Sequence, residues 1–391
     1  MNIQERIVQS LSIIHPKWKE LFDKHYSKLS DALQILIKCP PNDITPPIEQ
    51  IFSTFIINPE DIKVVIIGQD PYPKKGDACG LSFSCDGVIP KSFINMKVCL
   101  NRCGYQADSS DLRPWLYQGV MLLNMSLTTE VGQSNAHKSY WKPFVTAMIT
   151  ELTNLTDDIC FFLWGREIQV LKSHIKGRQH IYEWSHPSPA IDNTLIYEKK
   201  FVNCNHFEET SDIDWSTGKK IMIYTDGGSI LHVKSSYAVY IPKILRLYGL
   251  IEGSEYMMLD NKILTKPNTA IEPTSQRGEY LAITYALYIV KKLNMRNVVI
   301  VTDSANCVGI ITTWTKDTSK YKNSDIVFIM RKLFEQVRDR VDIVHTLSHM
   351  KDKNSPHNEG NNIVDKIASY AIKKCKDFDT YIDYQDVELN I

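Results

Sequence analysis

Three short runs of consecutive apolar residues constrain the fold of this chain more than any other feature. They lie at 63–68 (KVVIIG), 120–124 (VMLLN) and 159–165 (ICFFLWG). Such runs, rich in β-branched residues and followed by Gly or polar side chains, are typical of strands covered on both faces. A segment with helical spacing, 141–152, separates the last two runs. Strands that alternate with helices favour an α/β fold with a parallel sheet.

Helical spacing also extends from Pro16 to about Ile37, and the consecutive prolines after Cys39 must stop that helix. A polar, turn-forming stretch then separates this first pattern from a second one, after Phe207. We therefore expect one domain over residues 1–215, a linker over 216–219 and a second domain over 220–391.

The second pattern mixes strand pairing with helices. Residues 220–228 alternate as a strand, and 235–241 is expected to pair with them antiparallel. Helices and strands then alternate, at 278–293, 297–303, 324–337, 342–349 and from about 362. This order predicts an α/β domain with a mixed sheet.

The charge balance excludes one class of nucleic-acid binder. The chain has 45 basic and 45 acidic side chains, so it has no polycationic arm and any nucleic-acid site must be local. Its nine cysteines are scattered, and its first residues are too polar for a secretory signal or a membrane span. We expect an intracellular protein, cytoplasmic or nuclear, with reduced thiols and no membrane attachment.

Polar clusters follow all three apolar runs of the first half, where open α/β sheets place their ligand sites. GQDPYP occupies 68–73, the second run ends in Asn124, and HPSP occupies 186–189. Each has an ordinary explanation when taken alone: Asp70 and Asn124 as turn residues, His186 as a turn histidine bonded to backbone, and Phe83 as core.

Taken together and in this order, with GLSFS at 80–84, these motifs resemble the uracil-DNA glycosylases of the HPSP-bearing branch. The resemblance extends from about Trp18 to Trp215 and includes QSNAHKSYW at 133–141. It implies a three-layer α/β domain with a parallel sheet, and hydrolysis of the N-glycosidic bond to uracil in DNA, as in base excision repair. It implies no cofactor for this domain.

The resemblance also implies roles for individual residues. Asp70 would stabilise positive charge on the sugar and orient the attacking water, while a neutral His186 would donate to uracil O2. The base is first flipped out of the duplex and read by the amide of Asn124. Cytosine presents the opposite donor and acceptor pattern and would leave buried groups unpaired, at about 1–3 kcal/mol each.

Further residues would complete the pocket and the DNA contacts. Phe83 would stack on the flipped ring, Tyr72 would occupy the space of a thymine methyl, and Gln69 would contribute chiefly backbone contacts. Ser92 and Ser188 match positions where the family binds DNA phosphates.

Two residues depart from the family pattern. Pro73 follows DPY where the family usually has His, a feature similar to the poxvirus glycosylases, and this removes a phosphate contact. Ala190 replaces a bulky Leu after HPSP and is too small to fill the space left by a flipped base. Either Ile191 does so or flipping is less assisted. We expect weaker duplex binding with the bond-cleaving chemistry intact.

Four acids stand out in the second half: Asp226, Glu279, Asp303 and Asp365. Singly, each is explained as a helix cap, a first-turn acid or a solvated side chain. Together, YTDGG, RGEYLAI, VTDSANCV and GNNIVDKIA resemble the ribonuclease H family over Lys219–Lys374, most loosely in the fourth motif. The resemblance implies cleavage of the RNA strand of RNA–DNA hybrids. Because converging carboxylates repel one another without cations, it also implies two Mg²⁺ (or Mn²⁺) ions.

This family also places a mobile histidine before its last acid. His349 matches that position best, and His357 is the competitor because the loop is longer than usual. Asn306 and Gln276 are candidates for contacts with 2′-hydroxyl groups of the hybrid.

These resemblances leave two alternative hypotheses for the function of the chain. The first is a bifunctional DNA-maintenance hydrolase whose partners are uracil-containing DNA and RNA–DNA hybrids. In the second, one domain is a catalytically silent binding module, such as a glycosylase fold that serves as a replication scaffold. The sequence does not identify any protein partner.

Overall fold

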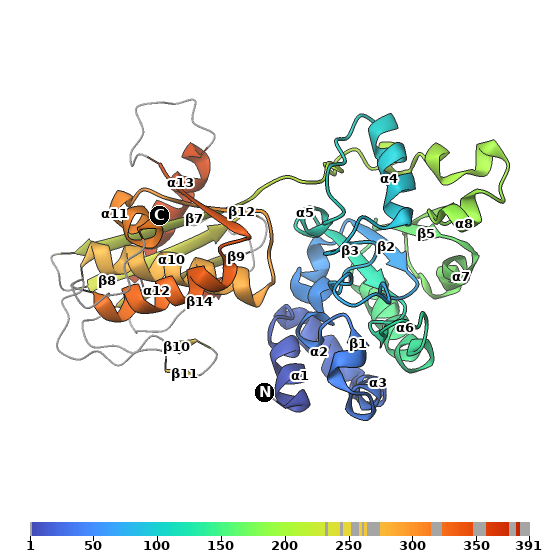
Figure 1. Ribbon diagram of the computed structural model, residues 1–391, viewed down its shortest axis with the longest axis horizontal. Helices are drawn as coiled ribbons and strands as arrows, with labels where there is room; N and C mark the ends of the chain where they lie inside the picture. Colours follow the sequence, from blue (N-terminus) through green and yellow to red (C-terminus); the bar gives the residue numbers. More distant parts are fainter. Residues whose placement is uncertain are drawn as a thin grey trace. The chain divides into compact units, whose positions relative to one another are not determined.

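The computed structural model describes residues 2–230, 234–242, 245–251, 258–259, 262–263, 274–313, 323–346, 357–374 and 381–383. The chain divides into two compact units, Met1–Lys219 and Lys220–Ile391 (Figure 1). Within the described ranges, no helix has the length and apolar character needed to cross a membrane.

The first unit is built on four parallel strands in the order β3-β2-β5-β6. These strands are β2 (Val64–Gly68), β3 (Val120–Asn124), β5 (Cys160–Trp164) and β6 (His180–Trp184). The predicted parallel α/β sheet is confirmed, and the adjacent strands β2 and β3, the second of which lies at one edge, are buried at every residue. Gly68 pairs with Asn124, so the motifs that follow β2 and β3 leave the sheet at the same edge.

Helices surround this sheet, and a small second sheet lies beside it. The longer helices are α1 (Ile3–Ser12), α2 (Pro16–Lys24), α3 (Tyr26–Lys38), α4 (Lys91–Arg102) and α6 (Lys138–Leu155). The short ones are α5 (Arg113–Leu116), α7 (Arg166–Gln169), α8 (Pro189–Asp192) and α9 (His206–Glu209). The small sheet pairs β1 (Ile44–Thr45) antiparallel with β4 (Thr129–Glu130). Turns of 3-10 helix cover 41–43, 48–50, 53–56, 59–61, 170–174, 197–199 and 201–203.

The helical stretch predicted from Pro16 to about Ile37 consists of two helices. It breaks at His25, whose Nε2 lies 2.8 Å from the carboxylate of Glu151 on α6. Across the same helices, the rings of Phe22 and Phe144 meet edge to face with centroids 4.9 Å apart. A tertiary contact therefore interrupts a helical pattern that is continuous in the sequence.

The second unit has a mixed six-stranded sheet in the order β13-β12-β7-β8-β9-β14, as predicted for its class. Its strands are β7 (Ile221–Ile230), β8 (Lys234–Ile241), β9 (Leu245–Ile251), β12 (Val298–Thr302), β13 (Val341–His345) and β14 (Tyr381–Asp383). β7 pairs antiparallel with β8 and parallel with β12. Separately, β10 (Met258–Leu259) pairs antiparallel with β11 (Lys262–Ile263).

Two long helices, α10 (Ser275–Lys292) and α13 (Asn358–Lys374), pack on opposite faces of this sheet. Neighbouring residues of a strand face opposite sides. A Cβ on Gly227 would lie 2.2 Å from the backbone nitrogen of Glu279 in α10, and one on Gly228 would lie 2.8 Å from Ile372 in α13. The two glycines of YTDGG therefore let both helices approach β7 closely. The remaining helices are α11 (Ala305–Thr312) and α12 (Ser324–Val337).

Candidate active sites

Asp70 lies in the loop after β2, held by the segment that leads into α6. Its Oδ2 accepts a hydrogen bond of 2.6 Å from the backbone N–H of Asn135. Burial raises the pKa of Asp70 above its ordinary value, although the Asn135 N–H and the charge of Lys138 act in the opposite direction. The carboxylate is thus oriented by backbone and poorly solvated, which strengthens its field at a neighbouring positive charge.

His186 follows β6, and its own motif fixes its tautomer. Its Nδ1 accepts a hydrogen bond of 3.0 Å from the backbone N–H of Ser188. A neutral imidazole that accepts at Nδ1 carries its proton on Nε2. Burial lowers the pKa of His186, against the opposing charge of Glu167. The ring is therefore a neutral donor at Nε2.

Asn124 ends β3 and is buried, directly opposite Gly68 of β2. A Cβ at Gly68 would lie 2.3 Å from Asn124 Oδ1 and 2.9 Å from Ser82 Cβ. The first position of GQDPYP must therefore be glycine for this amide to keep its place.

Phe83 is buried with its backbone in the left-handed region, at φ 61°. Such a conformation costs a bulky residue on the order of 1–2 kcal/mol and persists only where the surroundings impose it. The ring lies against Trp164, with centroids 5.3 Å apart, and against His186, at 5.8 Å. The structure thus brings together two predicted pocket residues that are more than a hundred positions apart in sequence.

Tyr72 and Ser92 lie next to Phe83. The Tyr72 hydroxyl donates to the backbone oxygen of Phe83 at 3.3 Å and lies 3.0 Å from the Ser92 hydroxyl. Gln69 presents its side chain to the carboxylate of Glu167, at 2.8 Å, and its backbone oxygen accepts from the N–H of Ser126. These bonds fix the loop around the pocket.

The HPSP loop continues into a cleft beside His186. The cleft has a volume of about 820 Å³ and is also lined by Ser188, Ala190 and Ile191. Ile191 is 49% exposed, so its side chain is available for contact with DNA. Asn95 of α4 donates to the backbone oxygen of Pro187 at 2.9 Å and anchors the loop.

The second site is a cluster of acids in the other unit. Asp226 of β7, Glu279 of α10 and Asp303 after β12 present carboxylate oxygens within 4.8 Å of one another. Burial, with the charges of Asp303 and Asp365, raises the pKa of Asp226 to about 6. Burial and the charge of Asp226 hold the pKa of Glu279 well above its ordinary value.

This cluster fits a divalent cation. Within the described parts of the chain, one buried oxygen of Glu279 has no hydrogen-bond partner. An unpaired buried carboxylate oxygen among repelling acids is unfavourable unless a cation lies beside it. Hard oxygen ligands are those that Mg²⁺ and Mn²⁺ prefer.

The structure describes most of the other residues predicted for this site. Asp365 is exposed on α13, outside the group of three, yet near enough for its charge to act on Asp226. His349 lies outside the described residues, and the ring of His357 lies 6.3 Å from that of Tyr224. Asn306 donates to the hydroxyl of Tyr280 at 3.5 Å. Gln276 is half-buried in the first turn of α10.

Two residues that act on Asp70, Asn135 and Glu167, have roles that the sequence motifs do not reveal. Asn135 acts through its backbone N–H, which carries no residue signature. Glu167 accepts hydrogen bonds from Gln69 and from Lys138, the latter at 2.6 Å, and joins two sides of the pocket. Only the spatial arrangement could identify this carboxylate.

The fold and the two sites define an enzyme class: hydrolases of nucleic acid with two catalytic domains. A family model described as the uracil DNA glycosylase superfamily matches residues 55–209, and one described as RNase H matches residues 218–373. The uracil-DNA glycosylase of Idiomarina loihiensis is 36% identical over 212 residues, which cover 52% of this chain and 93% of that protein. The chain belongs to the uracil-DNA glycosylase family and carries an RNase H domain in its second half.

Two further relatives come from viruses. The uracil-DNA glycosylase of Gallid herpesvirus 2 is 34% identical, over 54% of this chain and 72% of that protein. The crystal structure of mimivirus uracil-DNA glycosylase is 26% identical, with a TM-score of 0.49, over 55% of this chain and 90% of that one.

Proposed function

We propose that this protein excises uracil from DNA with its first unit and cleaves the RNA strand of RNA–DNA hybrids with its second. The observation that carries the proposal is that the first unit supplies two groups with complementary roles: the oriented, negatively charged carboxylate of Asp70 and the neutral hydrogen-bond donor of His186. N-glycosidic hydrolysis requires both, because the sugar becomes positive as the leaving base becomes negative.

In the proposed reaction, the carboxylate of Asp70 stabilises the developing charge on the sugar and orients the attacking water. His186 donates its Nε2 proton in a hydrogen bond to uracil O2 and keeps that proton. The Ser188 N–H supports this role because it stabilises the tautomer with an Nε2 proton. The bond between the sugar carbon and uracil N1 breaks, and the electron pair leaves with the base.

Selectivity for uracil rests on the residues around the flipped base. The buried amide of Asn124 pairs with uracil N3–H and O4, and Phe83 stacks on the ring. Tyr72, held by its bonds to the Phe83 backbone and Ser92, occupies the place of a thymine methyl.

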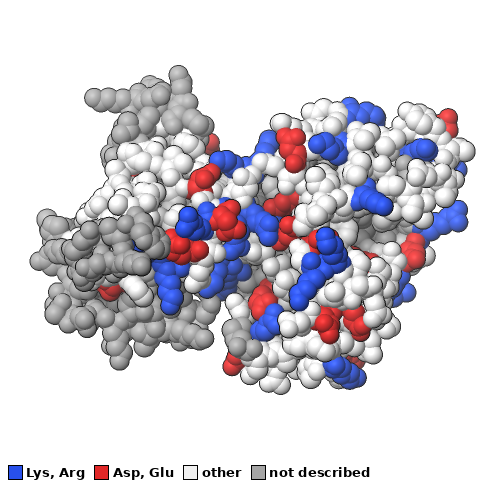
Figure 2. Space-filling view, in the orientation of Figure 1, with Lys and Arg blue, Asp and Glu red and all other residues white. Residues whose placement is uncertain are grey.

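DNA phosphates are bound by Ser92 and Ser188, and Ile191 enters the space that the base vacates. This mode suits the surface, because Figure 2 shows basic side chains interspersed with acidic ones on the visible face of the first unit. Hydroxyl and backbone N–H contacts position DNA without a strongly basic surface.

In the second unit, Asp226, Glu279 and Asp303 would hold two Mg²⁺ (or Mn²⁺) ions, with Asp365 completing the site from α13. Such ions would supply the chemistry of water activation and of charge stabilisation at the leaving 3′ oxygen. The protein's part is to hold the oxygens in place, and the buried position of Glu279 supports that. His349 precedes Asp365 and assists product release. Since both substrates contain DNA, we propose an intracellular site of action, cytoplasmic or nuclear.

Two oligonucleotides test the proposal: one with a central uracil, and one RNA–DNA hybrid, each with and without EDTA. Uracil release continues with chelator, and hybrid cleavage stops. Asp70→Asn abolishes only uracil release and Asp226→Asn only hybrid cleavage, so each variant is the control for the other. A parent protein that lacks one of the activities would favour the alternative, in which that domain is a silent binding module.

A further inference from the structure

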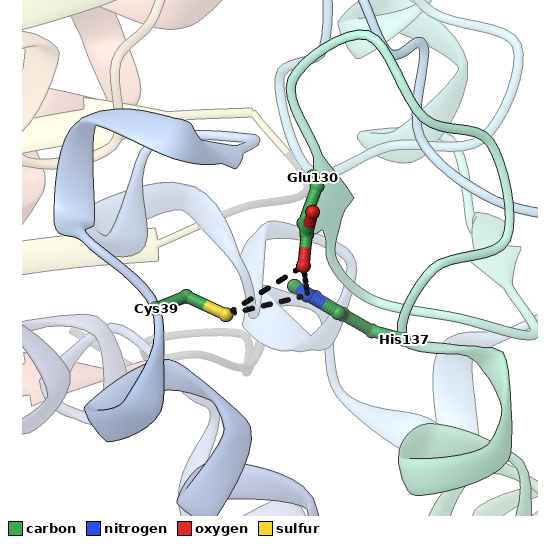
Figure 3. A group of neighbouring side chains, drawn as sticks. All are labelled: Cys39, Glu130 and His137. Atoms are coloured by element: carbon green, nitrogen blue, oxygen red, sulfur yellow. Dashed lines mark hydrogen bonds and ion pairs between the residues drawn. The ribbon is translucent and has the colours of Figure 1, made fainter.

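Three side chains outside both sites converge on one point in the first unit. Figure 3 shows Cys39, Glu130 and His137 directed toward one another. Cys39 Sγ lies 3.8 Å from His137 Nε2 and 3.9 Å from Glu130 Oε1, and these last two atoms are 3.8 Å apart. The three atoms form a nearly equilateral triangle.

These separations fit a shared metal ion better than they fit direct hydrogen bonds. A nitrogen and an oxygen 3.8 Å apart are too distant for a hydrogen bond. Around tetrahedral Zn²⁺, ligand atoms of these three types lie about 3.4–3.6 Å apart, given its usual bond lengths. A contraction of a few tenths of an ångström would bring all three into coordination.

The contacts behind the triangle hold two of its members in ligand geometry. His137 Nδ1 lies 2.9 Å from the Thr128 hydroxyl, which also accepts from the indole N–H of Trp141 at 2.6 Å. The His137 ring is thereby fixed with Nε2 toward Cys39. Gln133 donates to Glu130 Oε2 at 2.7 Å and leaves Oε1 for the triangle. Outer contacts of this kind orient the ligands of protein metal sites.

The backbone that carries the ligands is also fixed. Cys39 follows the last residue of α3 and precedes two prolines, and His137 occupies the N-cap position of α6. Glu130 lies in β4, paired with Ile44 of β1. His137 is buried, whereas the Glu130 side chain is 35% exposed, so an ion can enter from solvent and keep a water as its fourth ligand.

We propose that Cys39, Glu130 and His137 form a binding site for one Zn²⁺ ion. The loop that ends at His137 also contains Asn135, whose N–H holds Asp70. The bound ion therefore stabilises the loop that orients Asp70. Binding itself does not depend on the proposed function, but this effect on Asp70 does.

The test uses Co²⁺ as a spectroscopic substitute for Zn²⁺ in the metal-free full-length protein. A thiolate ligand gives an intense charge-transfer absorption with Co²⁺, whereas the all-oxygen cluster of the second unit gives none. The parent develops this absorption up to one equivalent, and one equivalent of Zn²⁺ removes it. Cys39→Ser abolishes the absorption. Cys160→Ser, which changes another partly buried thiol of the same unit, retains it.

Folding is checked separately by circular dichroism. Glu130→Gln removes one ligand charge without touching sulfur, and we expect weaker binding with the absorption still present at saturation. Zn²⁺ raises the melting temperature of the parent by more than that of Cys39→Ser, which keeps only the acidic cluster of the second unit. Absence of the absorption in the parent, or its persistence in folded Cys39→Ser, would overturn the proposal. Uracil release measured in parallel reports on the proposed function independently of these spectra.

Discussion

Replacing Gly68 with alanine tests the arrangement of the uracil pocket most directly. The added Cβ would lie 2.3 Å from Asn124 Oδ1 and 2.9 Å from Ser82 Cβ, both well inside van der Waals contact. Gly68 lies in a strand buried at every residue, so the Asn124 amide has to move. It would then lose the two hydrogen bonds that we propose between Asn124 and the base.

The magnitude follows from those two bonds. Each buried group left unpaired costs about 1–3 kcal/mol, so the transition state loses at least about 2 kcal/mol. That corresponds to a reduction of about 30-fold or more in kcat/KM for uracil release. The assay is single-turnover release of uracil from a single-stranded oligonucleotide, which separates pocket effects from base flipping.

Two controls make this result interpretable. Gly309→Ala places a methyl group in α11, where no atom beyond the neighbouring backbone of the same helix lies within 4 Å, and should leave uracil release unchanged. Hybrid cleavage by the second unit and the melting profile show whether Gly68→Ala is folded. Parent-level kcat/KM in folded Gly68→Ala would refute the placement of Asn124 in the pocket.

Three further predictions concern charge. Uracil release should stay level as the pH falls through 6.5, because burial lowers the pKa of His186 below that ordinary value and its neutral form persists; a pH profile with a step at 6.5 would contradict this. Glu167→Gln should move the acidic side of that pH profile to lower pH, because the charge of Glu167 raises the pKa of both Asp70 and His186. An acidic side at unchanged pH would exclude this effect of Glu167 on the two residues. Asp226→Asn should raise the melting temperature in EDTA at neutral pH, because a carboxyl whose pKa is raised from 3.8 to about 6 destabilises the fold there by up to about 3 kcal/mol. The same substitution should reduce the increase in melting temperature that Mg²⁺ causes. Calorimetry with and without Mg²⁺ measures both effects, and a lower melting temperature of Asp226→Asn in EDTA would refute the repulsion between the acids.

The sequence predicts elements well where the local pattern and the tertiary environment agree. The runs that became β2, β3 and β5 are apolar throughout because each strand is covered on both faces. β6 has no such run, because each of its residues is exposed or half-buried. The motif that carries His186 was therefore visible in the sequence while the strand that positions it was not.

The residues of the candidate sites also differ in whether the sequence predicts them. Side chains within compact motifs, such as Asp70 in GQDPYP, can be identified from the sequence alone. The backbone N–H of Asn135 is not, because every residue other than proline carries the same donor. Cys39 and His137 are also far apart in sequence and match no ligand spacing, so only the folded chain places their side-chain atoms 3.8 Å apart.

The bond from the Ser188 N–H to His186 Nδ1 has a consequence for successive catalytic cycles. With that nitrogen engaged as an acceptor, the imidazole cannot pass a proton from one side of the ring to the other. In the proposed reaction, the uracil anion departs without taking a proton from this side chain, so the histidine would end each cycle in the protonation state in which it began. Turnover would then require no step that restores a proton to His186.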